Sequence, residues 1–181
     1  MAEAAIVTLG VRESVPCRGR YSSFFVTRLP TKPAFVLALL YTADLERVVL
    51  MRRTRPAWQA GRVNALGGRL LSGETADAAA RREVREECGV DVAEWRVVLV
   101  WEDAEYRMHV VRAISDRARE ARTLEDQEVF LADVNALPPT VIDNLRWLVP
   151  LALDTDVAFP IAVRSADPDG SGLTERGRER E

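Results

Sequence analysis

The sequence has few of the side chains that usually build a zinc site or a disulfide framework. Its 181 residues include one histidine, His109, and two cysteines, Cys17 and Cys88. This set cannot supply the Cys and His ligands of an ordinary zinc site. A Ser-His-Asp triad would depend on His109, which lies in YRMHVVRA, an alternating stretch typical of a strand. We expect free thiols and an ordinary strand histidine, which leaves carboxylates as the abundant reactive groups.

The sequence also lacks long apolar runs and an excess of positive charge. The hydrophobic fraction is 48%, the charged fraction is 29% and the net charge is -3. No apolar segment approaches the ~20 residues needed to cross a bilayer, and the N-terminus does not resemble a signal peptide. We therefore expect a cytoplasmic protein without membrane association. The acidic balance also disfavours polymeric DNA or RNA as a partner, because a nucleic-acid backbone is usually bound by a basic surface.

The chain length predicts one ordinary domain. We place this domain at residues 33–155 and treat residues 1–32 as an N-terminal extension. Residues 156–181 end in a stretch rich in Gly, Pro, Ser and charge, which predicts a flexible C-terminal tail.

Strand-length apolar runs alternate with polar segments along the domain. The first two runs are separated by the polar stretch TADLE and predict a hairpin. Residues 76–88 predict a helix that Thr75 caps at its start and Gly89 ends, and residues 141–149 show helical spacing. This order favours a mixed α/β or α+β sandwich. The expected strands are 35–41, 47–53, 95–103, 105–115 and 128–134.

The segment REVREE, residues 82–87, places three glutamates on the first predicted helix. On a helical wheel Glu83 and Glu87 continue the core-facing line of alanines, and Glu86 lies beside it. Carboxylates grouped on such a face repel one another and resist burial, a conflict that a divalent cation would remove. The alternative is a solvated helix surface. The glycine-rich turn GGRLLSGE upstream favours the cation, because backbone there can approach phosphate and metal closely.

From Gly68 the sequence runs as Gly, five residues, Glu74, seven residues, then Arg82-Glu83-Val84-x-Glu86-Glu87-x-Gly89-Val90. This pattern resembles the Nudix box, G-x5-E-x7-R-E-U-x-E-E-x-G-U, at every specified position. The similarity to bacterial and phage Nudix hydrolases of the MutT-like kind extends over about residues 33–153, through RPAWQAGRVNALGG and NLRWLVPLA.

The resemblance implies an α+β fold, an α/β/α sandwich with a mixed β-sheet between helices, in which the box forms a loop, a helix and a loop. It also implies a hydrolase that uses Mg2+ or Mn2+. It implies that Glu83, Glu86 and Glu87 are metal ligands and catalytic residues, with the backbone carbonyl of Gly68 as a further ligand. Carboxylates suit Mg2+, which proteins hold through a few carboxylates together with substrate phosphates. The structural residues that the motif implies are Glu74, Arg82 and Gly89.

The general base and the substrate contacts lie outside the box. In TLEDQEV both Glu125 and Glu128 are candidates for the base, and the acid-then-aliphatic pattern of the family favours Glu128; a solvated residue is the alternative. The resemblance places four residues near the substrate. Trp58 has a core position as its alternative, and an asparagine amide can both donate to and accept from a base. The four residues are Trp58, Asn64, Asn144 and Trp147.

The expected reaction is hydrolysis of the diphosphate linkage of a small-molecule nucleoside diphosphate derivative, foremost a (d)NTP or an oxidised nucleotide such as 8-oxo-dGTP. Tyr106 lies near the position of a tyrosine that is typical of dinucleoside polyphosphate hydrolases, so dinucleoside polyphosphates are an alternative substrate. ADP-ribose is another alternative. A non-catalytic nucleotide-sensing module is the rival from a different class, although a sensor would not need the complete set of acids. The sequence does not determine the oligomeric state, and a homodimer is one possibility.

Overall fold

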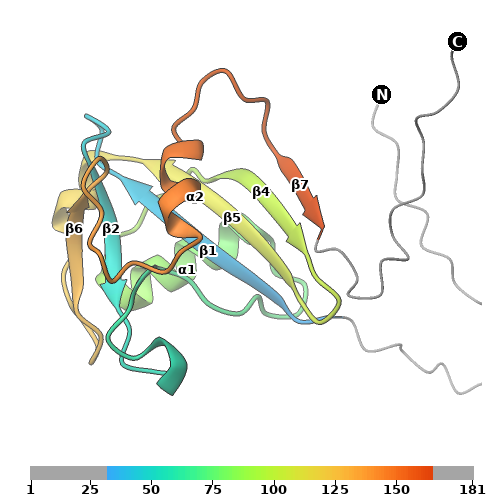
Figure 1. The fold of residues 1–181 in the computed structure, drawn as a ribbon, viewed down its shortest axis with the longest axis horizontal. Coiled ribbons are helices and arrows are strands. Elements are labelled where there is room, and N and C mark those ends of the chain that lie inside the picture. The colour runs from blue at the N-terminus through green and yellow to red at the C-terminus, as the bar shows by residue number, and fades with distance from the viewer. Residues whose placement is uncertain (1–31, 165–181) are drawn as a thin grey trace, which may run out of the picture. The chain divides into compact units, whose positions relative to one another are not determined.

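The structure is a computed structural model that describes residues 32–164 (Figure 1). The expected extension, most of the expected tail and Cys17 lie outside these residues. One mixed sheet is flanked by two helices. The strands are β1 (Ala34–Tyr41), β2 (Arg47–Arg52), β3 (Val63–Ala65), β4 (Arg96–Glu102), β5 (Arg107–Ile114), β6 (Val129–Asp133) and β7 (Ile161–Arg164). The helices are α1 (Ala76–Cys88) and α2 (Leu145–Leu151), with short 3-10 helices η1 (Ala57–Gln59) and η2 (Asp116–Glu120).

The sheet has the strand order β3-β2-β1-β5-β4-β7, and β6 pairs with β2. The strand β1 runs parallel to β5 along its whole length. Its antiparallel pairing with β2 is at Tyr41 and Val48, so the expected hairpin forms but its strands separate after the turn. The backbone after β3 takes the place beside β1: Val36 N donates to the Gly68 carbonyl and Ala38 N to the Leu66 carbonyl, both at 2.8 Å. This mixed sheet confirms the expected α+β sandwich.

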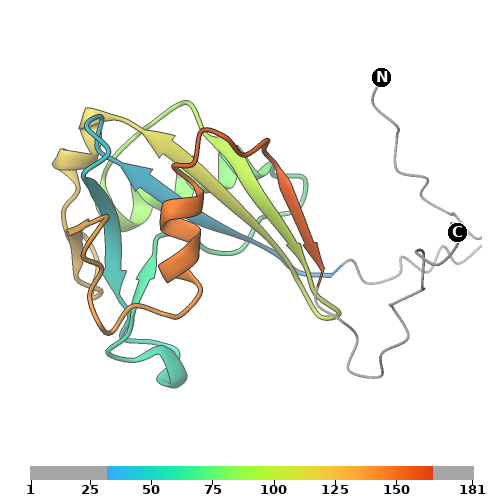
Figure 2. The same ribbon diagram turned by 45° about the horizontal axis from the view of Figure 1, so that its top comes forward.

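Each face of the sheet has its own hydrophobic core, because side chains alternate along the strands. Val49 and Met51 point to the face covered by α1, whereas Val48 and Leu50 point to the face covered by α2. In Figures 1 and 2 the two helices lie on opposite sides of the sheet. The helix residues in these cores are Ala79, Ala80, Val84 and Cys88 of α1, and Leu145, Leu148 and Val149 of α2.

The helix α1 forms where its local signals predict it. The Thr75 side chain accepts a hydrogen bond from Ala78 N at 3.4 Å, and Gly89 ends the helix in the left-handed conformation, at φ 78°. The helical wheel predicted the burial of Glu87 correctly. Its prediction that Glu86 lies beside the buried face is wrong, because the Glu86 side chain is 51% exposed. Val84 and Cys88 occupy the core instead, because the buried face of the helix is rotated toward them and away from Glu86. Within residues 32–164, no helix is long and apolar enough to cross a membrane.

Two elements near the C-terminus differ from the sequence expectations. The helix α2 begins at Leu145, four residues later than the helical spacing predicted. The strand β7 was not predicted; it pairs in parallel with β4, from Leu99 with Ile161 onwards. The sheet therefore extends beyond residue 155, into the segment that was expected to be tail.

Candidate active site

Two consecutive glycines bring the loop after β3 against β1 and α1. A Cβ atom on Gly67, at φ 135°, would lie 2.1 Å from the Val36 carbonyl oxygen. A Cβ atom on Gly68 would lie 2.4 to 2.7 Å from the carboxylate atoms of Glu83. Only glycine leaves room for these approaches. The loop backbone and the Glu83 carboxylate are therefore in direct contact.

Arg82 of α1 is the centre of an ion-pair network that connects the helix to this loop. Its Nε and Nη2 donate to the two carboxylate oxygens of Glu74, each at 2.9 Å. Its Nη1 donates to Glu83 Oε1 at 2.7 Å and to Glu86 Oε2 at 3.3 Å, and Nη2 also reaches the Arg69 carbonyl at 3.1 Å. The hydrogen bonds from Arg82 hold the pKa of the Glu74 carboxyl below its ordinary value. Arg82 thus ties two box glutamates to the glycine loop.

Glu87 is a buried carboxylate at the end of α1, and it is 8% exposed. Its Oε2 accepts a hydrogen bond from Gly67 N at 2.9 Å, and its Oε1 lies 3.7 Å from Arg53 Nη1. Burial raises the pKa of Glu87 to about 7, and the negative charges of Glu83 and Glu125 add to this rise. The anionic form of Glu87 is therefore disfavoured in the protein alone, and a cation would stabilise it.

The donor chemistry of the three box glutamates fits a hard divalent cation. Within residues 32–164, no three Asp, Glu, His or Cys side chains form a ready-made metal site. Glu83 and Glu86 are instead directed to Arg82, so they would have to turn toward a cation shared with Glu87. The Gly68 carbonyl accepts one hydrogen bond, from Val36 N. Its second lone pair can still serve as a ligand.

The two candidate bases, Glu125 and Glu128, lie in the loop before β6 and have different surroundings. Thr123 closes this loop, because its Oγ1 accepts a hydrogen bond from Val129 N at 2.9 Å. Glu128 Oε2 accepts from Arg52 Nε at 2.9 Å, and its side chain is 61% exposed. The Arg52 guanidinium lies over the Phe130 ring, which packs on the α2 face. Glu125, by contrast, acts electrostatically on Glu87.

Trp58 and Asn64 lie around β3. Trp58 is 71% exposed on η1, so a core position is wrong for it. Figure 2 shows the loop that carries η1 projecting from the body of the domain. Asn64 pairs with Met51 across β3 and β2, and its Oδ1 accepts from Ala65 N at 2.8 Å. Its Nδ2 is 3.5 Å from Gln59 Oε1, which connects β3 to η1.

Asn144 immediately precedes α2, and backbone hydrogen bonds connect this region to β3. Val63 N donates to the Thr140 carbonyl, and Ile142 N donates to the Val63 carbonyl. Asn144 Oδ1 is buried without a hydrogen-bond partner among the described residues. Trp147, one turn later, is 41% exposed and lies 6.3 Å from Trp101 between ring centroids. Hence β3 and the start of α2 bring the Asn64 and Asn144 segments together.

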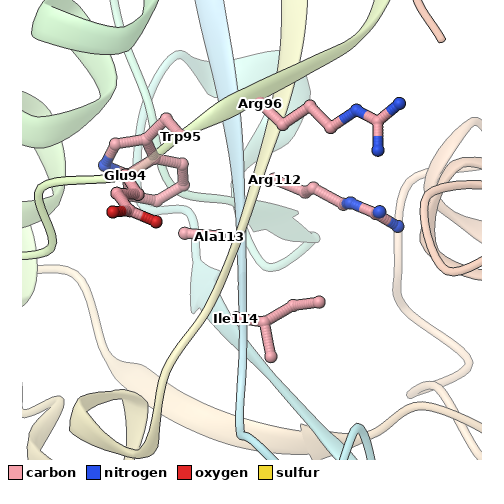
Figure 3. Close-up of a pocket in the computed structure, with 6 residues that line it drawn as sticks. All are labelled: Glu94, Trp95, Arg96, Arg112, Ala113 and Ile114. Atoms are coloured by element: carbon pink, nitrogen blue, oxygen red, sulfur yellow. The ribbon is translucent and has the colours of Figure 1, made fainter.

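Figure 3 shows a hollow at the C-terminal end of β5. Its volume is about 320 Å³, and none of the expected site residues lines it. Arg96 and Arg112 extend side by side there, and both guanidiniums lie 5.4 Å from the Phe159 ring centre. Arg112 also donates to the Ala152 carbonyl at the end of α2. These contacts give both arginines a structural role.

The sequence analysis assigned no role to two residues that are buried at this end of the sheet. Arg53 Nε and Gln127 Oε1 are buried polar atoms without a hydrogen-bond partner among the described residues. Arg53 was expected only as the last residue of a strand. A polar residue just before a strand gives no sign that it is buried, so the sequence carried no usable signal for Gln127.

A model of the NUDIX domain matches residues 30–156. Dihydroneopterin triphosphate diphosphatase from Escherichia coli (strain K12) is 37% identical over 71 residues, which are 38% of this chain and 44% of that protein. The protein of the same name from Shigella flexneri gives the same values. The match thus spans less than half the length of these curated relatives.

Solved structures are similar over most of the chain. A NUDIX hydrolase from Nitrosomonas europaea has a TM-score of 0.58 at 18% identity, covering 76% of this chain and 82% of that one. A MutT NUDIX hydrolase from Burkholderia pseudomallei has a TM-score of 0.55 at 22% identity, covering 66% and 96%. At such identities the likeness is one of fold.

Proposed function

The chain belongs to the Nudix hydrolase family, and on that premise we propose that it hydrolyses the diphosphate linkage of a nucleoside triphosphate or a closely related small molecule with the help of Mg2+ or Mn2+. The observation that carries this proposal is the cluster of Glu83, Glu86 and Glu87 around the glycine loop. Two of these carboxylates share Arg82, and the third is buried with a raised pKa. Repulsion and burial of these carboxylates destabilise the folded protein unless a cationic ligand binds them.

In this proposal Glu83, Glu86 and Glu87 hold the cation, together with the Gly68 carbonyl. The bound cation would polarise the phosphate oxygens and offset the negative charge that develops as the anhydride bond breaks. Arg82 keeps Glu83 and Glu86 close to the loop, and its own position is fixed by Glu74. Gly89 ends α1 directly after the ligands, so that the chain can turn away.

We assign the role of general base to Glu125 ahead of Glu128. Glu125 is the loop acid whose charge acts on Glu87, whereas Glu128 is held by Arg52. A general base must reach the water that attacks phosphorus, and the water must stand beside the carboxylate cluster.

Substrate binding is proposed for Trp58, Asn64, Asn144 and Trp147. The buried, unpaired Oδ1 of Asn144 supports a role in holding a heterocycle, because an unmet acceptor in a buried position is costly unless a ligand satisfies it. The exposed ring of Trp58 offers a stacking surface on the projecting loop.

Guanine nucleotides and their oxidised form are the leading substrates. A pterin triphosphate is a second candidate, favoured by the 37% identity to dihydroneopterin triphosphate diphosphatase over 71 residues. Guanine and pterin share the 2-amino-4-oxopyrimidine edge, which presents N–H donors to an acceptor such as Asn144 Oδ1. One asparagine could therefore hold either ring.

The test is a substrate panel with Mg2+, Mn2+ or EDTA. It should include dGTP, 8-oxo-dGTP, dATP, dihydroneopterin triphosphate, ADP-ribose and diadenosine polyphosphates. We expect metal-dependent turnover of at least one triphosphate, lowered roughly 10² to 10³-fold in Glu86→Gln. Binding of nucleotides without turnover of any compound would identify a sensor instead.

The role of Asn144 can be tested within the same panel. Asn144→Leu should raise KM for the preferred substrate about tenfold, since one hydrogen-bonding group is lost from the binding pocket. Asn135→Leu, at an exposed turn, is the matched control and should leave KM unchanged. Equal KM values for Asn144→Leu and the wild-type protein would remove Asn144 from the site.

A further inference from the structure

Two buried polar side chains at the end of the β2–β6 pairing have unmet hydrogen-bonding atoms of opposite kind. Arg53 Nε can only donate, and Gln127 Oε1 can only accept. Neither atom has a partner among the described residues, although both are buried. Gln127 as a whole is 5% exposed. Because an unpaired buried group costs more than an unpaired exposed one, a buried donor and a buried acceptor that both lack partners point to a ligand.

The strand register places these two residues next to each other. Arg52 N donates to the Glu128 carbonyl at 2.8 Å, which continues the β2–β6 ladder one step beyond Met51 and Val129. Arg53 follows Arg52, and Gln127 precedes Glu128. The two residues therefore flank the last pair of the ladder, where opposed residues are about 5 Å apart at Cα.

The surroundings of Arg53 connect this pair to the carboxylate cluster. Its Nη1 lies 3.7 Å from Glu87 Oε1 and donates to Met51 Sδ at 3.3 Å. The Nε atom therefore stays free for another acceptor. The loop that carries Gln127 is fixed from both sides, by Thr123 with Val129 and by Arg55 with Asp126 at 3.6 Å. The backbone on either side of Gln127 thus has contacts of its own.

We propose that Arg53 and Gln127 are positioning residues that hold one water molecule beside Glu87, the water used in hydrolysis. A single water can accept from Arg53 Nε and donate to Gln127 Oε1. Its second O–H then remains for Glu125, the proposed general base, and its second lone pair for phosphorus. A phosphate oxygen fits this arrangement less well, since it cannot donate to Gln127 Oε1. This inference rests on the proposed hydrolysis, and it concerns only how the water is oriented.

The test is Gln127→Met, which keeps the length of the side chain and removes its polar atoms. We expect kcat to fall about 10- to 100-fold, because orientation of the reacting water is lost, while KM and the affinity for Mn2+ measured by paramagnetic resonance stay within about twofold. The melting temperature should rise by about 2 °C or more, because an unmet buried polar group is replaced by an apolar one.

The matched control is Thr42→Val, at a buried polar residue whose hydrogen bonds are all made. The Thr42 hydroxyl donates to Asp44 and accepts from Arg47 N, so its loss should lower the melting temperature and leave kcat unchanged. If Gln127→Met instead lowers the melting temperature as Thr42→Val does, or leaves kcat unchanged, the water-positioning role is overturned. A wild-type protein without turnover would refute the proposed function; the sign of the temperature shift would then still decide whether Gln127 is an unsatisfied group.

Discussion

Arg82 and Glu74 face each other with two parallel hydrogen bonds, Nε to Oε1 and Nη2 to Oε2, each 2.9 Å long. This fork geometry is specific to arginine, because a lysine offers a single ammonium group. Since the same guanidinium also binds Glu83 and Glu86, it connects the glycine loop with the acidic face of α1.

Arg82→Lys should therefore lower the free energy of unfolding by about 2 kcal/mol, measured by urea denaturation. Arg81→Lys is the matched control on the same helix. Arg81 also pairs with a carboxylate in a two-point contact, that of Asp91, but both side chains are largely exposed. Its replacement should cost clearly less than that of Arg82, because exposed ion pairs contribute little to stability. Similar losses in the two variants would show that Arg82 is an ordinary surface arginine.

Gly68→Ala should separate activity from stability. The added methyl group would meet the end of the flexible Glu83 side chain, which can move aside. We expect kcat to fall at least tenfold, with a loss of unfolding free energy of only about 1 kcal/mol.

Gly67→Ala is the comparison, since its methyl group would meet the Val36 carbonyl at 2.1 Å, and backbone cannot move aside. That variant should lose about 3 kcal/mol or more. Full activity in Gly68→Ala would mean that the position of Glu83 is not critical.

Glu87 should make the stability of the metal-free protein depend on pH. Its pKa rises from 4.5 to about 7 on folding, so between these values the folded protein binds more protons than the unfolded chain. The free energy of unfolding should then fall as pH rises through this window, by up to about 3 kcal/mol in total. The cost is absent below pH 4.5 and complete above pH 7.

The measurement is the difference in unfolding free energy between the wild-type protein and Glu87→Gln, from pH 5 to pH 8 in EDTA. Glutamine does not titrate, so the difference isolates Glu87. Adding Mg2+ should shrink the difference above pH 7, because a cation favours the charged carboxylate. A difference that is constant with pH would contradict the assigned burial cost.

The two loop acids should differ in their effect on the rate. Glu125→Gln should lower kcat about 10²-fold with little change in metal affinity, as expected for a group that takes a proton from water. Glu128→Gln should lower kcat less than about threefold, because this carboxylate belongs to an exposed pair with Arg52. Rates for both variants at saturating metal decide the assignment; a larger loss in Glu128→Gln would return the role of base to Glu128.

Local signals were enough to predict the helix that carries the carboxylates. Thr75 and Gly89 mark its ends, and the spacing of Glu83 and Glu87 showed which side they would take. The exposure of Glu86 could not be predicted, because the direction of the buried face depends on what packs against it. Here that is the β1–β5 side of the sheet, which reaches Val84 and leaves Glu86 in solvent.

Contacts between distant segments could not be predicted. The strand β7 is short and alternates between partly buried and exposed residues, so its sequence differs little from a loop until β4 offers an edge. Gln127 is buried only because the loop before β6 closes over it, and Arg53 meets Glu87 only when β2 lies under α1. Such burial depends on the whole fold rather than on neighbouring residues.

The parallel pairing of β1 with β5 also determines when α1, the helix that carries the glutamates, can pack in its final position. Ala34 pairs with Arg107, and Tyr41 with Ile114, so the two central strands are separated in the chain by everything from the hairpin to β4. Closing such a long loop is slow compared with forming a helix. During synthesis α1 emerges before β5, and its acidic face has no complete sheet to rest on. The glutamates therefore leave the ribosome before β5, one of the strands that α1 packs on, and they can be ordered as a site only after β5 has paired with β1.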